Sequence, residues 1–270
     1  MGSSARAFLL ALQYFTRLPL PPPMARWTGY SAELQRASLA HFPAMGWLVG
    51  AVAVVVYWLG TRFLPASAMT PWVAAVISTA ATAMLTGGLH EDGLADTADG
   101  LGGSWDRDRA LDIMKDPRLG SHGALALTLG LMAKTGLLAL IGSVAGVGGA
   151  AAALFGAHVA SRGLTLVIVA TLPSIGRAAR SRTLQVADGM SCAGQAVAIT
   201  WTLLGLALVG IWFSPAFAVS GFLAGLAVLA WMRRLLARRL QGFTGDGLGA
   251  TQQCCELGFY LGACLFARGA

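Results

Sequence analysis

Charged residues are scarce in this sequence. Only 11% of its 270 residues are Asp, Glu, Lys or Arg, and 56% are hydrophobic. A soluble domain carries roughly 25% charged residues. The mean hydropathy of the chain is +0.66. This shortage of charge argues against a soluble protein and predicts a membrane protein.

Cysteines and nucleotide-binding motifs are also sparse. The four cysteines have neither the spacing of metal ligands nor the pattern of a disulfide framework, so we interpret them as small buried residues. The sequence has no Walker-type loop and no dinucleotide fingerprint, and nothing in it indicates ATP hydrolysis. It has no basic stripe with interleaved aromatic residues, so the net charge of +7 does not call for a nucleic acid partner. Anionic lipid headgroups account for that charge.

Long apolar runs, in contrast, recur along the chain. Seven stretches approach or exceed the roughly 18 residues needed to cross a bilayer. They cover residues 41–60, 71–89, 122–143, 147–172, 195–213, 216–232 and 249–267. We therefore predict an all-α polytopic membrane protein, with residues 1–270 forming a single integral-membrane domain. The stretch before the first span predicts an interfacial helix stopped by the prolines at 21–23, and not a cleaved signal peptide.

The basic residues predict the orientation of these spans. Fifteen of the 19 lysines and arginines fall in segments 1–39, 91–121, 173–194 and 233–248. Because cytoplasmic loops of membrane proteins are enriched in Lys and Arg, all four segments are expected in the cytoplasm, together with the N-terminus. The protein is then a multi-pass protein of a bacterial inner membrane.

The acidic residues are concentrated in one of these segments. Eight of the twelve lie between residues 91 and 116. Asp92, Asp96 and Asp99 are spaced i, i+4 and i+7, which places three carboxylates on one face of a helix. Their mutual repulsion would be relieved by a hard divalent cation such as Mg²⁺, which prefers oxygen ligands. The alternative is an exposed acidic loop without a ligand.

The stretch "KDPRLGSHG" follows the acidic segment. It combines Lys115 and Arg118 with a hydroxyl and glycines where the third span begins. Cations and free backbone N–H groups at a helix N-terminus suit a phosphate, although cytoplasmic anchoring alone would also explain the two cations. Residues 107–115, between the two motifs, predict a short helix on the membrane surface, ended by Pro117.

Further polar residues lie inside the spans. Lys134 and Arg162 fall near the middle of two spans, with His158 one turn before Arg162, so they are expected to face a polar cavity and not to reach the membrane surface. A last polar stretch, residues 242–256, contains Asp246. Its "DGLGAT" resembles the "DGLADT" at 92–97, which suggests two polar half-sites that meet on the cytoplasmic side.

The motifs together resemble those of the cobalamin synthase family, the adenosylcobinamide-GDP ribazoletransferases. The resemblance rests on "GGLHEDGLADTADGLGG" followed by "IMKDPRLGSHGALAL", supported by "ALQYFTRLPLP", "HFPAMGWLVG", "ASRGL" and "GFTGDGLGA" in the same order. It covers residues from about 8 to 260. One departure is Gln253, at a position where many relatives are expected to carry glutamate.

The resemblance implies a reaction and its residues. A hydroxyl of α-ribazole, or of its 5′-phosphate, attacks the cobinamide-bearing phosphorus of adenosylcobinamide-GDP and displaces GMP. The implied Mg²⁺ ligands are Asp92, Asp96 and Asp99, with Glu91 ranked below them. The implied catalytic residues are Asp96, Asp99 (as general base) and Lys115. The implied substrate-binding residues are Lys115, Asp116, Arg118, Ser121, Lys134, Arg162 and Asp246. The expected partners are the two substrates and membrane lipid; a homo-oligomer and association with other cobalamin-pathway enzymes are compatible with the sequence.

Two alternatives remain open at this stage. A CDP-alcohol phosphotransferase also uses a membrane aspartate array, but its Ala-Arg pair is replaced here by Asp96 and Thr97. A divalent-cation transporter would carry acidic residues near the bilayer midplane. In this chain the carboxylates are expected at helix ends and the mid-span charges are cationic, which favours an enzyme.

Overall fold

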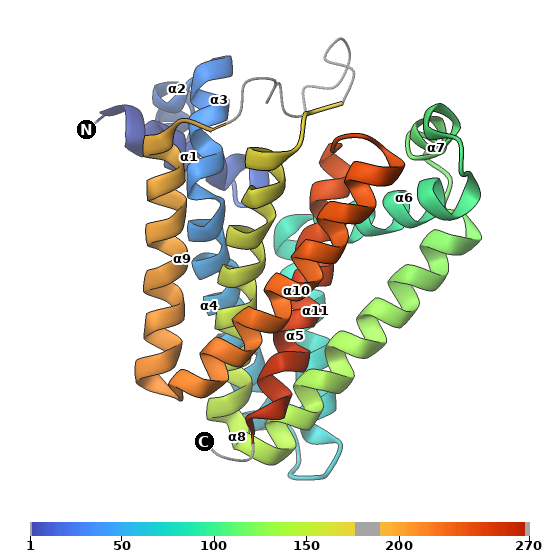
Figure 1. The fold of residues 1–270 in the computed structure, drawn as a ribbon. Coiled ribbons are helices and arrows are strands. Elements are labelled where there is room, and N and C mark those ends of the chain that lie inside the picture. Colours follow the sequence, from blue (N-terminus) through green and yellow to red (C-terminus); the bar gives the residue numbers. More distant parts are fainter. Residues whose placement is uncertain (1, 176–189, 268–270) are drawn as a thin grey trace.

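The computed structural model describes residues 2–175 and 190–267, and the regular elements in this part of the chain are helices (Figure 1). The eleven α-helices are α1 (Gly2–Phe15), α2 (Pro22–Thr28), α3 (Ala32–Ser38), α4 (Phe42–Phe63), α5 (Thr70–Thr86), α6 (Leu89–Gly103), α7 (Arg107–Ile113), α8 (Ser121–Thr171), α9 (Cys192–Trp212), α10 (Pro215–Arg239) and α11 (Gly245–Leu265). A short 3₁₀ helix, Leu39–His41, precedes α4.

The helices of the bundle follow the order of the predicted spans. Four of them, α4, α8, α9 and α10, are long and apolar enough to cross a membrane, and α5 together with α6 gives a fifth such unit. At 51 residues, α8 is far longer than a bilayer is thick, and it is divided at Gly146, whose φ of 67° and ψ of −170° are not helical. Figure 1 shows its two arms, 121–145 and 147–171, running in opposite directions. With α5 and α11, seven helical arms correspond to the seven predicted spans.

The chain bends sharply between α5 and α6. Gly87 and Gly88 both adopt a φ of +69°, a backbone conformation that glycine tolerates and other residues rarely adopt. The bend between the two helices is 90°, and α6 runs across the end of the bundle (Figure 1). The predicted span 71–89 therefore ends earlier, at Thr86. The segment expected as a cytoplasmic loop, 91–121, is mostly helical.

The prolines near the N-terminus have a role that differs from the predicted one. We expected Pro21–Pro23 to stop the first helix, but α1 already ends at Phe15, and Pro22 and Pro23 are the first residues of α2. The physical reason is that proline lacks a backbone N–H and has a fixed φ, which suits the first helical turn. α1 buries Ala7, Ala11 and Phe15 against the bundle end.

The helix α11 lies at the centre of the molecule. It packs against α6, α8 and α10, and its polar side chains Gln252, Gln253 and Glu256 are buried. The neighbouring helices supply their hydrogen-bond partners, which explains how a helix interrupted by polar residues is accommodated. Large apolar side chains on the outside of the bundle, such as Ile211 and Met84, are exposed and suit contact with lipid.

One end of the bundle collects the described parts of the segments predicted to be cytoplasmic; most of the predicted segment 173–194 lies outside the described residues. Figure 1 places α1 to α3, α6, α7 and the junction of α10 with α11 at the same end. The turn between the two arms of α8 lies at the opposite end (Figure 1). Most of the described acidic and basic residues are therefore on one side of the molecule.

Candidate active site

Asp99 links the acidic helix to the third predicted span. Its side chain is buried and accepts hydrogen bonds from the backbone N–H groups of Gly120 and Gly123, each at 2.8 Å. It thus caps the N-terminus of α8. A Cβ atom at Gly120 or Gly123 would lie within 2.4 Å of an Asp99 oxygen, so this contact requires glycine at both positions.

This arrangement bears on two explanations that the sequence left open for "KDPRLGSHG", a phosphate site and cytoplasmic anchoring. Two of its backbone N–H groups donate to the carboxylate of Asp99, so these two are not free for a phosphate. A carboxylate in the chain satisfies the same donors and the same positive end of the helix dipole as a phosphate does. The contact spans more than twenty residues of sequence, so helical spacing alone could not reveal it.

The helices α6 and α11 approach each other through glycine. A Cβ atom built on Gly93 would lie 2.8 Å from the backbone oxygen of Asp246, and one on Gly249 would lie 3.3 Å from the Cα of Gly93. The absence of side chains lets the two backbones meet. The sequences "DGLADT" and "DGLGAT" are therefore in contact, as the predicted meeting of two polar half-sites requires.

This contact brings the acidic side chains of two helices together. Burial, and then the carboxylates of Asp92, Asp246 and Asp99, raise the pKa of Asp96 to about 6. The four carboxylates therefore act on one another, and the donors are all oxygen atoms. Within residues 2–175 and 190–267, no three His, Cys, Asp or Glu side chains are already arranged around a metal position. The metal-ligand assignment of Asp92, Asp96, Asp99 and Glu91 stays a prediction.

Two cavities adjoin these carboxylates, and Asp246 lines both. The first, of about 260 Å³, is polar and is bounded by Arg107, Asp108, Asp112, Lys115, Thr244 and Asp246, among others. The second, of about 80 Å³, is mainly apolar and includes Tyr14, Phe15, Phe42, Leu248, Asp92 and Asp246 in its lining. Burial and the nearby Asp246 carboxylate raise the pKa of Tyr14 to about 12.

The predicted cations are distributed unevenly around the site. Lys115 lines the polar cavity, and its Nζ atom lies 3.7 Å from Asp112 Oδ1. Arg118 is exposed and donates to Asp116 through Nε at 2.8 Å, and this hydrogen bond lowers the pKa of Asp116 to about 2. Arg118 and Asp116 thus bind each other and do not line either cavity. Ser121 is the exposed first residue of α8.

Lys134 and Arg162 lie elsewhere, inside the bundle. Each is 2% exposed, and the Nζ atom of Lys134 lies 2.6 Å from a carboxylate oxygen of Glu256 on α11. The structure does not bring them together with Lys115, because they belong to an internal cluster of charges. Glu91 also points inward, where one of its oxygens accepts a hydrogen bond from Gln253 at 3.2 Å.

Some residues of the site were not found by sequence reasoning. Arg107 lines the polar cavity and donates from Nε to the backbone oxygen of Leu240 at 2.7 Å. Tyr14 and Thr244 line the two cavities beside Asp246. Arg107 had been assigned only to a membrane-surface helix, and its contact with the end of α10 depends on tertiary packing.

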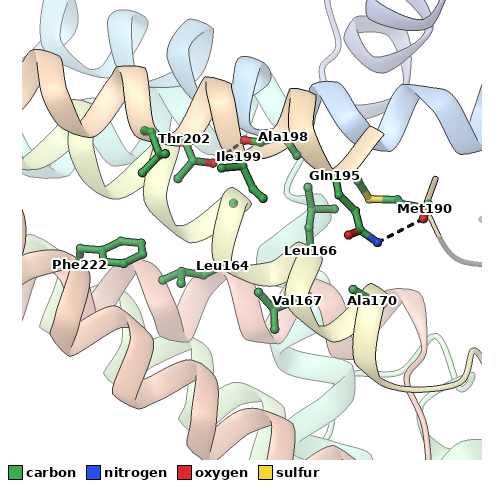
Figure 2. Close-up of a pocket in the computed structure, with 12 residues that line it drawn as sticks. Leu164, Leu166, Val167, Ala170, Met190, Gln195, Ala198, Ile199, Thr202 and Phe222 are labelled. Atoms are coloured by element: carbon green, nitrogen blue, oxygen red, sulfur yellow. Dashed lines mark hydrogen bonds between the residues drawn. The ribbon is translucent and has the colours of Figure 1, made fainter. Parts of the chain in front are cut away.

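A further cavity, of about 230 Å³, lies between the second arm of α8, α9 and α10. Figure 2 shows its walls, with Leu164, Leu166 and Val167 of α8 facing Ile199 and Thr202 of α9, and Phe222 of α10 beside them. At one end Gln195 donates to the backbone oxygen of Met190 at 3.3 Å (Figure 2). Its lining contains no acidic or basic residue, so it offers no groups for phosphoryl transfer.

Comparison with known proteins identifies the family of the chain. The chain is 52% identical to the adenosylcobinamide-GDP ribazoletransferase of Polaromonas sp. (strain JS666 / ATCC BAA-500), over 95% of both chains. It is 49% identical to the enzyme of that name from Polaromonas naphthalenivorans (strain CJ2), over 95% of this chain and 96% of the relative, and 40% identical to that of Shewanella amazonensis, over 94% and 93%. No solved structure matches. The model of the family described as Cobalamin-5-phosphate synthase matches residues 7–264, and the chain therefore belongs to that family.

Proposed function

We propose that this protein is an adenosylcobinamide-GDP ribazoletransferase that acts at the final stage of cobalamin assembly. It transfers the adenosylcobinamide-phosphate group from adenosylcobinamide-GDP to α-ribazole or its 5′-phosphate and releases GMP. The family match and the names of the relatives support this activity. They give no support to a CDP-alcohol phosphotransferase or a cation transporter.

One observation carries the assignment of the site. Asp246 on α11 lies at the junction of two cavities and within electrostatic range of Asp96 on α6. One cavity is polar and contains the cations Arg107 and Lys115, which suits the diphosphate of the donor. The other is apolar and aromatic. Phosphoryl transfer depends chiefly on positioning and on neutralising charge, and these cavities supply groups for both.

The acidic face of α6 fits a divalent cation. Its carboxylates offer only oxygen atoms. Burial, and then the neighbouring carboxylates, raise the pKa of Asp96, and a bound cation would offset both effects by stabilising the charged form. Mg²⁺ is usually held by one or two carboxylates together with substrate phosphates, so Asp92 and Asp96 suffice to hold it. Bound there, Mg²⁺ would neutralise charge on the diphosphate and on the GMP leaving group.

The other residues act directly on the substrates. Arg107 and Lys115 bind the phosphate oxygens and stabilise the charge that develops on them. Asp246 accepts the proton of the attacking hydroxyl, because it faces both cavities. This role was expected of Asp99, but both Asp99 oxygens accept backbone hydrogen bonds that fix α8 relative to α6. Asp99 therefore positions the acidic helix.

The site is proposed to face the cytoplasm of a bacterium, with the protein in the inner membrane. Support comes from the basic residues, because those in α1 to α3, α7 and the end of α10 lie at the same end of the bundle as the acidic helix (Figure 1).

The first test is GMP release. Protein purified in detergent is given adenosylcobinamide-GDP, α-ribazole and Mg²⁺, and GMP is quantified by chromatography. We expect release that requires both ribazole and Mg²⁺, and that falls at least a hundredfold in Asp92→Asn. Glu33→Gln, a change of an exposed acid on α3, serves as the matched control and should retain full activity. Release that persists with a chelator would contradict the role of Mg²⁺, and a folded protein without any release would contradict the activity.

A further inference from the structure

Three helices, α6, α8 and α11, contribute to a cluster of charged and polar groups inside the bundle. Glu256 of α11 is 1% exposed and lies at its centre. One Glu256 oxygen lies 2.6 Å from Lys134 Nζ and accepts a hydrogen bond from the Tyr260 hydroxyl at 3.0 Å. The other accepts from Gln252 at 2.7 Å. A charge at this depth is costly unless it is paired, and here Lys134 and Glu256 pair directly.

The same cluster reaches the acidic helix α6. Gln253 donates to Glu91 Oε1 at 3.2 Å and to the side-chain oxygen of its neighbour Gln252 at 3.1 Å. The cluster thus contains two cations, Lys134 and Arg162, and two carboxylates, Glu256 and Glu91. Because Lys134 is paired with Glu256, Arg162 and Glu91 remain as the second pair of opposite charges.

Arg162 and Glu91 do not touch directly. One terminal nitrogen of Arg162 donates to the backbone oxygen of His158 at 2.9 Å, and the guanidinium carbon lies 5.6 Å from the centre of the Phe42 ring. Glu256, and after it Glu91, act electrostatically on Arg162. No direct ion pair joins Arg162 and Glu91 in the described part of the chain.

Both side chains line one small cavity. Its volume is about 10 Å³, and it is lined by residues of α4, α5, α6, α8 and α11 that include Glu91, Arg162, His90 and His158. Each of these four has one buried polar atom without a hydrogen-bond partner, namely Glu91 Oε2, Arg162 Nε, His90 Nε2 and His158 Nε2. Three of the side chains belong to residues at most 4% exposed. Unpaired buried polar atoms are costly, and a space of this size with several polar partners is what one water molecule needs.

We propose that one bound water bridges Glu91 Oε2 and Arg162 Nε, and that this water-bridged pair positions α6 for cation binding. Glu91 precedes Asp92 directly in the first turn of α6. Its inward pairing fixes the rotation of the helix about its axis, and hence the direction in which Asp92 and Asp96 point. The positioning step rests on the proposed cation site, whereas the bridged pair does not.

The proposal differs from direct coordination of the metal by Glu91, and a double-mutant cycle separates the two. Mn²⁺ serves as the probe, and its binding is followed by the loss of the free-ion signal in electron paramagnetic resonance. The proteins compared are the wild type, Glu91→Gln, Arg162→Gln and the double variant, with Glu33→Gln as the control. Residues that orient metal ligands typically change metal affinity by 10- to 100-fold.

We expect each single change to weaken Mn²⁺ binding about tenfold, and the double change to weaken it no further. The control should bind as the wild type does. If Glu91→Gln removes binding while Arg162→Gln leaves it unchanged, Glu91 is a ligand and the proposal is wrong. Effects that simply multiply in the double variant would also overturn it.

A second measurement tests the bridged pair even if a variant does not fold or if the wild type binds no Mn²⁺. Thermal unfolding of the same proteins in EDTA should show the same non-additivity in melting temperature, because the pair exists without metal. If Glu91→Gln or Arg162→Gln aggregates, Glu91→Asp and Arg162→Lys replace them. Lys keeps the positive charge but has a methylene group where Arg has Nε, so Arg162→Lys should still weaken Mn²⁺ binding. A wild type that binds no Mn²⁺ would contradict the proposed cation site, while additive melting temperatures would contradict the bridged pair.

Discussion

At the scale of single residues, the sequence predicted which side chains share a helical face but not their contacts with distant parts of the chain. The spacing of Asp92, Asp96 and Asp99 was sufficient to place three carboxylates on one helical face, and α6 contains all three. Spacing could not show that Asp99 contacts Gly120 and Gly123. That contact depends on how the segment between α6 and α8, which includes α7, folds back toward α6. In the same way, Lys134 and Arg162 were expected to be buried, but Glu256 as the partner of Lys134 follows only from the central place of α11.

Replacing Asp99 tests its role as a cap. In Asp99→Ala, the buried N–H groups of Gly120 and Gly123 lose their acceptor, and the free energy of unfolding should fall by about 1–2 kcal/mol. Asp108→Ala, at an exposed side chain, should leave stability unchanged. Reversible unfolding in mild detergent, followed by circular dichroism, measures both. Equal stability of the two variants would show that Asp99 does not cap α8.

The raised pKa of Asp96 predicts a stability that depends on pH and metal. An acid whose pKa is raised from 3.8 to about 6 in the folded state destabilises the fold as it ionises, so stability in EDTA should decrease as the pH rises from 4 to 6. Asp96→Asn removes this penalty. Because Asp96 is only partly buried and solvent screens its charge, we expect a gain of only about 1 kcal/mol at pH 7.

Added Mg²⁺ should make the wild type more stable than Asp96→Asn, the reverse of their order in EDTA. It should raise the melting temperature of the wild type and have little effect on Asp96→Asn. A variant that is less stable than the wild type in EDTA at pH 7 would refute the repulsion among these carboxylates.

At the scale of helices, the sequence located the apolar arms well and their ends less well. The missed feature was the turn at Gly87 and Gly88, which lies inside an apolar run and gives no sign in hydropathy. That turn converts an expected loop into a helix across the bundle end. The contact between α6 and α11 was suggested by two similar hexapeptides, and its physical basis is the pair Gly93 and Gly249.

Adding one methyl group to this contact should separate the two helices. In Gly93→Ala the new Cβ would lie 2.8 Å from the backbone oxygen of Asp246, which cannot move as a side chain could. We expect a loss of GMP release of at least tenfold, together with weaker dependence on Mg²⁺. The matched control is Gly136→Ala, because a Cβ there has nothing within 4 Å. Full activity of Gly93→Ala would argue against a site shared by α6 and α11.

At the scale of the whole molecule, the charge distribution predicts one orientation in the membrane. The loop between α4 and α5 and the helix α7 lie at opposite ends of the bundle (Figure 1). In a variant without native cysteines, Ser67→Cys should react with a membrane-impermeant maleimide on spheroplasts. Asp108→Cys should react only after the membrane is permeabilised. The reverse pattern would place the candidate active site outside the cytoplasm.

The pairing of Lys134 with Glu256 also has a consequence for biogenesis. The chain is synthesised from its N-terminus, so the arms of α8 that carry Lys134 and Arg162 leave the ribosome well before α11 does. During that interval two cations are in or near the bilayer without the carboxylate of Glu256. The early helices are thus held in an incomplete bundle that is costly to keep in lipid. Insertion of α11 between them completes the charge balance, and this makes assembly of the bundle cooperative with the arrival of its most polar helix.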